Sequence, residues 1–68
     1  MQFELKEEYI ELYKLIKLLD LVDSGAEAKQ IVAQGDVIRN GEVELRKRAK
    51  LIKGDLLEIG DEVKIEIL

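Results

Sequence analysis

The sequence predicts an α+β domain, in which two helices pack on one face of a small, mostly antiparallel sheet of four to five strands. Apolar residues with helical spacing dominate the first half of the chain, after a short alternating start. Short alternating stretches dominate the second half, and the turn signals Asn40-Gly41, Gly54-Asp55 and Gly60-Asp61 separate them. Helices followed by a run of strands are typical of an α+β domain.

With 68 residues, the chain is expected to form one domain over residues 1–68 with a small core. It has no cysteine and no histidine, which excludes disulfides, zinc sites built on thiolate or imidazole, and histidine-based catalysis. No nucleophile–base pair, phosphate loop or metal cluster is visible, so we expect a non-enzyme with no cofactor and no metal.

We expect a cytoplasmic location and no membrane partner, because no signal peptide and no bilayer-spanning stretch is visible. We expect no small-molecule substrate. A charge-rich surface without an obvious apolar patch favours a monomer. The absence of proline, with abundant Leu, Ile, Val, Glu and Lys, suits either a heat-adapted or an engineered sequence, and the two alternatives stay open.

The first half is predicted to hold a strand and two helices. Residues Met1–Lys6 alternate, with Phe3 and Leu5 facing a core. Glu8–Leu19 is the first predicted helix and Ser24–Gln34 the second. The first helix has an apolar stripe of Tyr9, Leu12, Ile16 and Leu19, and Leu21 and Val22 after it are expected to fill the core. The second helix begins with a capping box of Ser24 and Glu27 and ends at a left-handed Gly35.

The second half is predicted to form two hairpins. Asn40-Gly41 favours a type I′ turn between strands at Asp36–Arg39 and Glu42–Arg46, because that turn needs positive φ twice. Alternation places Val43 and Leu45 on one face of the second strand. The last hairpin is expected over Leu56–Ile59 and Glu62–Leu68, with Val63, Ile65 and Ile67 facing inward.

The distribution of charge is more informative than its sum. The net charge of −4, taken alone, argues against nucleic-acid binding, since phosphate contacts need Lys and Arg. However, five basic residues and no acidic residue lie between Arg46 and Lys53, which creates a local positive field on an acidic body. This run is either a phosphate-binding loop or a solvated loop.

The order of these signals resembles the RNA-binding domain of the ribosomal protein S-four type, also called the αL RNA-binding motif. The run Glu42–Lys50 is similar to that of its small stand-alone bacterial members, and the resemblance covers nearly the whole chain. It implies a non-catalytic module that binds structured RNA, typically ribosomal or transfer RNA. The residues that carry it are Ser24, Glu27, Ala28, Lys29, Gly35, Val37, Asn40, Gly41, Gly54 and Asp55.

The resemblance also implies an RNA-binding surface. The family's basic position on the second helix falls on Lys29, and its basic loop on Arg46–Lys50. On the outer face of the first helix, Lys14 and Lys17 either point at the ligand or are solvated and paired, as the Glu11–Lys14 spacing allows. The predicted RNA-binding residues are Lys14, Lys17, Lys29, Arg39, Arg46, Lys47, Arg48 and Lys50.

Three positions depart from the family pattern. Gly25 and Gln30 stand where many members are basic, and Arg39 replaces an apolar residue of the G-x-V-x-V-N-G pattern. Either Arg39 adds a phosphate contact beside the hairpin, or a bulge turns Arg39 outward and Ile38 inward.

The aromatic residues are expected in the core or at its edge, and none lies in the basic run. This argues against a platform on which single-stranded bases stack. Structured RNA would instead be recognised through its shape, phosphates and 2′-hydroxyls. The alternative is a protein-interaction module with an acidic body and one basic contact loop. A DNA-binding helix-turn-helix is disfavoured, because Ser24–Gln34 offers few base-reading side chains.

Overall fold

The computed structural model describes all residues, 1–68, and confirms the predicted α+β class. Its main sheet has five strands in the order β1-β7-β6-β3-β4. Neighbouring strands are antiparallel except β1 and β7, which are parallel. The strands are β1 Gln2–Phe3, β3 Val37–Arg39, β4 Glu42–Val43, β6 Leu56–Ile59 and β7 Val63–Ile67.

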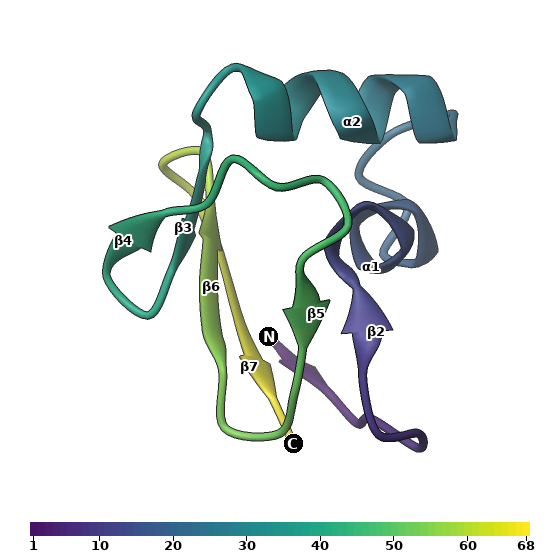
Figure 1. Cartoon of the computed structure of the whole chain (residues 1–68), viewed down its shortest axis with the longest axis vertical. Helices are drawn as coiled ribbons and strands as arrows, with labels where there is room; N and C mark the ends of the chain where they lie inside the picture. The colour runs from purple at the N-terminus through teal and green to yellow at the C-terminus, as the bar shows by residue number, and fades with distance from the viewer.

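A second, two-stranded sheet was not predicted from the sequence. It pairs β2, Ile10–Glu11, with β5, Lys50–Leu51, in antiparallel register. In Figure 1 these two strands stand beside the main sheet, below α1. The pairing holds residues 10–11 in extended conformation, so the helix predicted from Glu8 begins only at Leu12 as α1, Leu12–Leu18. The expected helical stripe therefore does not include Tyr9.

The second helix, α2, spans Gly25–Ala33 and is close to its prediction. The Ser24 hydroxyl accepts a hydrogen bond from the Glu27 N–H at 3.2 Å, which is one of the two bonds of the predicted capping box; the return bond from the Ser24 N–H to the Glu27 carboxylate is not formed. Gly35 has a φ of +82°, and its N–H donates to the Val32 carbonyl at 3.1 Å, which closes the helix. The predicted start and stop of this helix are both confirmed.

The core lies where the two helices meet the sheet (Figure 1). Burial of these apolar side chains is the main term that stabilises so small a domain. The predicted inward positions Leu5, Ile65 and Ile67 are buried, and Phe3, Leu21, Val22 and Val63 pack partly buried around them. The fully buried residues of the helices are Leu12, Leu15, Ile16, Ala28 and Val32.

The strand predicted over Glu42–Arg46 ends early, at Val43. The turn before it is confirmed, because Asn40 and Gly41 both have positive φ, of 51° and 87°. Beyond the turn, the expected alternation is reversed: Leu45 is 62% exposed, while Glu44 is buried. The Glu44 carboxylate is paired in this position with the largely buried Arg39 and with Arg46, which compensates the cost of burying its charge.

No helix of this structure has the length and apolar character needed to cross a membrane. No three side chains of the His, Cys, Asp or Glu type are grouped so that they could hold a metal ion.

Replacing Gly35 with Ala is expected to lower the free energy of unfolding by about 1–2 kcal/mol, the cost of a left-handed backbone for a residue with a Cβ. A Cβ at this position would meet only Val43, at 3.9 Å, so the cost is conformational rather than steric. Denaturant unfolding measures the change. The matched control is Gly25→Ala in the first turn of α2, which should stabilise by up to about 1 kcal/mol. Equal effects of the two substitutions would contradict the assigned helix stop.

Candidate nucleic-acid interface

The basic loop, Arg46–Lys50, is fixed on the start of α1. The Leu12 N–H donates to the Ala49 carbonyl at 2.9 Å, and the Tyr13 N–H donates to the Lys47 carbonyl at 3.0 Å. The first amides of a helix have no partner within the helix, and Glu11 at the N-cap provides no side-chain hydrogen bond. The loop backbone therefore caps α1, and Ala49 is buried in the contact.

Arg39 secures the other side of the loop. Its guanidinium donates to Asp55 from Nε at 3.1 Å and from Nη2 at 2.8 Å, and Nη2 also donates to the Lys50 carbonyl at 2.8 Å. Both ladders of β3 keep regular register through Arg39, so the proposed bulge is wrong. The Arg39 side chain is 20% exposed and is largely engaged within the protein.

The Asp55 carboxylate accepts hydrogen bonds from three residues. Besides Arg39, the carboxylate accepts from the Ile52 N–H and from Nδ2 of Asn40, each at 2.9 Å. Burial alone would raise the pKa of Asp55, but the hydrogen bonds from Ile52, Asn40 and Arg39 together lower it below its usual value. Asp55 thus links the Asn40-Gly41 turn, Arg39 and the chain that follows β5.

Glu44 pairs with the first residue of the basic loop. Arg46 donates from Nε to one carboxylate oxygen at 3.0 Å and from Nη2 to the other at 3.1 Å, while Nη1 of Arg39 lies 3.5 Å away. The hydrogen bond from the Arg46 side chain outweighs burial and lowers the pKa of Glu44. Part of the predicted binding charge is therefore already neutralised within the protein.

Four of the eleven Lys and Arg residues make ion pairs with carboxylates, and the others make none. The paired cations are Lys14, Arg39, Arg46 and Lys64. Lys17, Lys29, Lys47, Arg48 and Lys50 of the predicted site are unpaired. An unpaired cation keeps its full charge for an external anion, so these residues are the stronger candidates for phosphate contacts.

Two tyrosine rings lie next to these unpaired cations. The Lys29 ammonium lies 4.9 Å from the ring centroid of Tyr13, and the Arg48 guanidinium lies 5.9 Å from it. The Lys50 ammonium lies 4.9 Å from the ring centroid of Tyr9. The basic run itself contains no aromatic residue, and Tyr13 lies at the core edge as expected, but Tyr9 is exposed and the fold brings both rings beside the cations. Docking of the loop on α1 places Arg48 near Tyr13, and the β2–β5 pairing places Lys50 near Tyr9.

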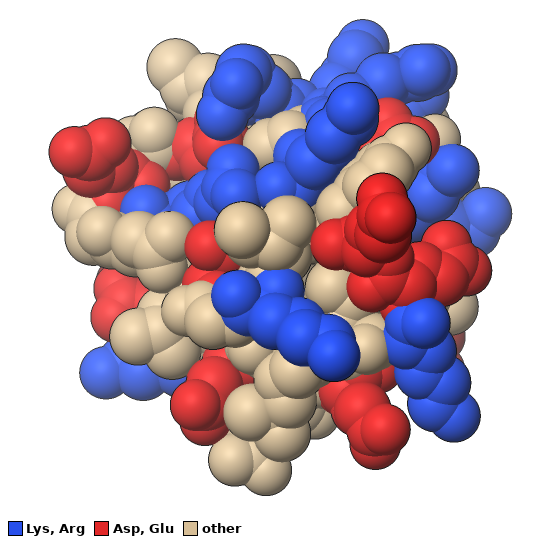
Figure 2. All heavy atoms as spheres, turned by 60° about the horizontal axis from the view of Figure 1, so that its bottom comes forward, with Lys and Arg blue, Asp and Glu red and all other residues tan.

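A small pocket opens at the basic loop. Cationic side chains and one alanine line it, with no carboxylate in the lining: Arg39, Arg46, Arg48, Ala49 and Lys50. Figure 2 shows Lys and Arg side chains gathered in a band over the upper part of one face, with acidic groups beside and below it. This cationic pocket is suited to a phosphate group, because the unpaired Arg48 and Lys50 both line it beside the paired Arg39 and Arg46.

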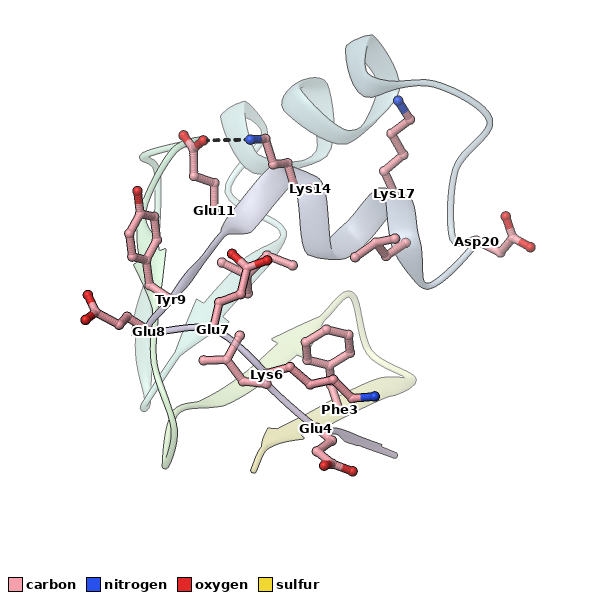
Figure 3. A pocket seen from close by; sticks show the side chains of 13 residues that line it. Phe3, Glu4, Lys6, Glu7, Glu8, Tyr9, Glu11, Lys14, Lys17 and Asp20 are labelled. Carbon is pink, nitrogen blue, oxygen red and sulfur yellow. Dashed lines mark ion pairs between the residues drawn. The ribbon is translucent and has the colours of Figure 1, made fainter.

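Lys14 and Lys17 belong to a different part of the surface. They line a groove between the N-terminal segment and α1 (Figure 3), and Lys14 pairs with Glu11 at 3.2 Å. Five carboxylates also line this acidic groove: Glu4, Glu7, Glu8, Glu11 and Asp20. The structure thus brings together Arg39, Arg46, Arg48 and Lys50 at the cationic pocket and places Lys14 and Lys17 among acids.

The fold and the cationic pocket define a small α+β domain of the αL type, with two helices, a hairpin and a basic loop that is hydrogen-bonded to the first helix. The chain belongs to the S4 domain family, whose model matches residues 3–68.

Two small bacterial proteins are similar to this chain over most of their length. YbcJ of Escherichia coli (strain K12) is 45% identical over 49 residues, 72% of this chain and 70% of that protein. Its solution structure, described as containing an αL motif involved in RNA binding, has a TM-score of 0.68 at 39% identity and covers 96% of this chain and 85% of that chain. In Bacillus subtilis (strain 168), the "Probable ribosome maturation protein RlbA" is 38% identical over 52 residues, 76% of this chain and 73% of that protein.

A larger protein contains the same fold as one part. The crystal structure of the 30S ribosomal protein S4e from Thermoplasma acidophilum matches with a TM-score of 0.65 and 31% identity. The match covers 79% of this chain and 29% of that chain.

The replacement Asp55→Asn should lower the free energy of unfolding at neutral pH by about 1–3 kcal/mol, because Arg39 keeps only a neutral acceptor. In the variant, the free energy of unfolding should also fall less steeply as the pH is lowered below neutral. Since the folded-state pKa of Asp55 is lowered, its contribution is present above its unfolded pKa and is lost as pH falls through its folded pKa. Denaturant unfolding at pH 7 and about pH 3 tests both points. Parallel stability curves for the variant and the original protein would contradict the role given to Asp55.

Proposed function

We propose that this domain binds structured RNA, in a ribosomal context, and performs no chemistry on it. The observation that carries the proposal is the cationic pocket at the basic loop, lined by four cationic side chains and no carboxylate. Structured RNA is recognised mainly through phosphates, 2′-hydroxyls and shape, which requires fixed positive charges rather than a catalytic group. The αL motif of YbcJ and the ribosome-related name of RlbA support RNA as the ligand class.

In this proposal, the contact residues have unequal roles. Lys29, Lys47, Arg48 and Lys50 bind phosphates, because no carboxylate of the protein competes for them. Arg39 and Arg46 line the pocket, but Asp55 and Glu44 already compensate their charge, so their main role is to hold the loop in shape. Lys14 and Lys17 act at the margin of the interface, because they line the acidic groove and Lys14 is paired with Glu11.

The acidic body has a part in this function. Its carboxylates give the domain a net charge of −4, so a polyanion is repelled from most of the surface and meets only one positive face. The same distribution orients the domain on its RNA. We further propose that it acts in the cytoplasm as a monomer and takes no small-molecule substrate.

The salt dependence of RNA binding tests this function. For a stem-loop RNA, log Kd should rise linearly with log salt concentration, because bound phosphates release counterions. The double substitution Lys29→Ala and Arg48→Ala should weaken binding and reduce that slope by about 2, one unit per lost phosphate contact. Fluorescence anisotropy at several salt concentrations measures both quantities.

The matched control for this experiment is Lys64→Ala, which removes an exposed cation that is paired with Glu58 on the sheet. It should leave the slope unchanged. Failure of the unmodified protein to bind stem-loop RNA and ribosomal RNA at low salt would overturn the proposed function. An equal loss per removed charge, about half as large in the single-charge control as in the double variant, would show that net charge alone, rather than this face, determines binding.

A further inference from the structure

Tyr9 faces outward immediately before β2 of the two-stranded sheet, and the residue is 41% exposed. Successive side chains of a strand alternate between faces. Ile10 pairs with the fully buried Leu51 on the inner face, so Tyr9 and Glu11 project to the outer face together with Lys50, the partner of Glu11. An exposed aromatic ring in this position contributes little to the core and is available to a ligand.

Lys50 connects this ring to the cationic pocket. Its ammonium lies 4.9 Å from the Tyr9 centroid, and the same side chain lines the pocket with Arg39, Arg46 and Arg48. Lys50 has no carboxylate partner. A phosphate in the pocket and a base at Tyr9 would therefore occupy adjoining positions, with Lys50 between them. A nucleotide likewise carries a phosphate at one end and a base at the other.

The other side of Tyr9 borders the acidic groove. Tyr9 lines this groove together with Glu7, Glu8 and Glu11, as the labelled side chains in Figure 3 show. The five carboxylates of the groove outnumber its three lysines, Lys6, Lys14 and Lys17, so its net charge disfavours phosphates. A nucleobase is uncharged and has a π-face that stacks on tyrosine. The charge pattern therefore keeps the RNA backbone on the Lys50 side and admits only a base to the ring.

We propose that Tyr9 stacks on an unpaired nucleobase, so that the domain recognises RNA where such a base adjoins the phosphate held at the basic loop. This inference rests on the proposed RNA-binding function and adds the kind of RNA element to it. Bases inside a continuous A-form helix are covered by their neighbours, so the ligand is a loop, bulge or strand end. Stacking on one aromatic ring tolerates any base, so the recognised feature is an exposed base rather than a sequence.

Two stem-loop RNAs test this proposal. They share one stem and the same loop phosphates, but one loop carries adenines and the other is abasic. The unmodified protein should bind the adenine loop about 5- to 150-fold more tightly, the range that corresponds to one stacked base. Tyr9→Leu should lose this preference, whereas Tyr9→Phe, which keeps the ring, should retain it. Anisotropy measures the affinities, and thermal unfolding checks that each variant is folded.

A direct readout comes from fluorotyrosine labelling. The chain has two tyrosines, so its ¹⁹F spectrum has two signals, and Tyr13→Phe assigns them. The Tyr9 signal should shift with the adenine loop and much less with the abasic loop. Equal affinity of the unmodified protein for both loops, or a preference that survives in Tyr9→Leu, would overturn base stacking and leave the proposed function intact. Binding of neither RNA would instead overturn the proposed function itself.

Discussion

The docking of the basic loop on the first turn of α1 is the interaction on which the rest of the site depends. The Ala49 carbonyl accepts a hydrogen bond from the Leu12 N–H and the Lys47 carbonyl accepts one from the Tyr13 N–H, and no side chain caps these amides. A loop dense in positive charge would otherwise repel itself into solvent. Held by its backbone, the loop leaves the side chains of Lys47, Arg48 and Lys50 without carboxylate partners and brings Arg48 near Tyr13. It also leads the chain into β5 and its pairing with β2.

The cations of the site divide into two groups by what they touch. Arg39 and Arg46 hold the ends of the loop through Asp55 and Glu44, buried carboxylates that satisfy several donors each. Lys29, Arg48 and Lys50 touch tyrosine rings instead and keep their charge available. A cation over an aromatic face is positioned without being neutralised, which a carboxylate partner could not achieve. The site is thus ordered before any ligand arrives.

Local signals in the sequence predicted most of the fold. The Ser24 cap, the Gly35 stop and the Asn40-Gly41 turn depend on nearby residues alone, and the structure confirms each of them. The β2–β5 pairing joins segments forty residues apart, so the sequence pattern gave α1 too early a start. The inward turn of Glu44 likewise depends on Arg39. Charge pattern alone therefore could not distinguish the paired Arg39 from the unpaired Arg48, or place Tyr9 and Tyr13 beside cations.

The most direct test of this binding face is a titration of ¹⁵N-labelled protein with a stem-loop RNA, followed by amide chemical shifts. The shifts should concentrate on the basic loop, Lys29 and residues 9–13, and should be small in the acidic segment at residues 4–8. That result would agree with a ligand held by the docked loop. Shifts concentrated instead around the exposed apolar residues Val43, Leu45 and Leu56, with the loop unaffected, would contradict it.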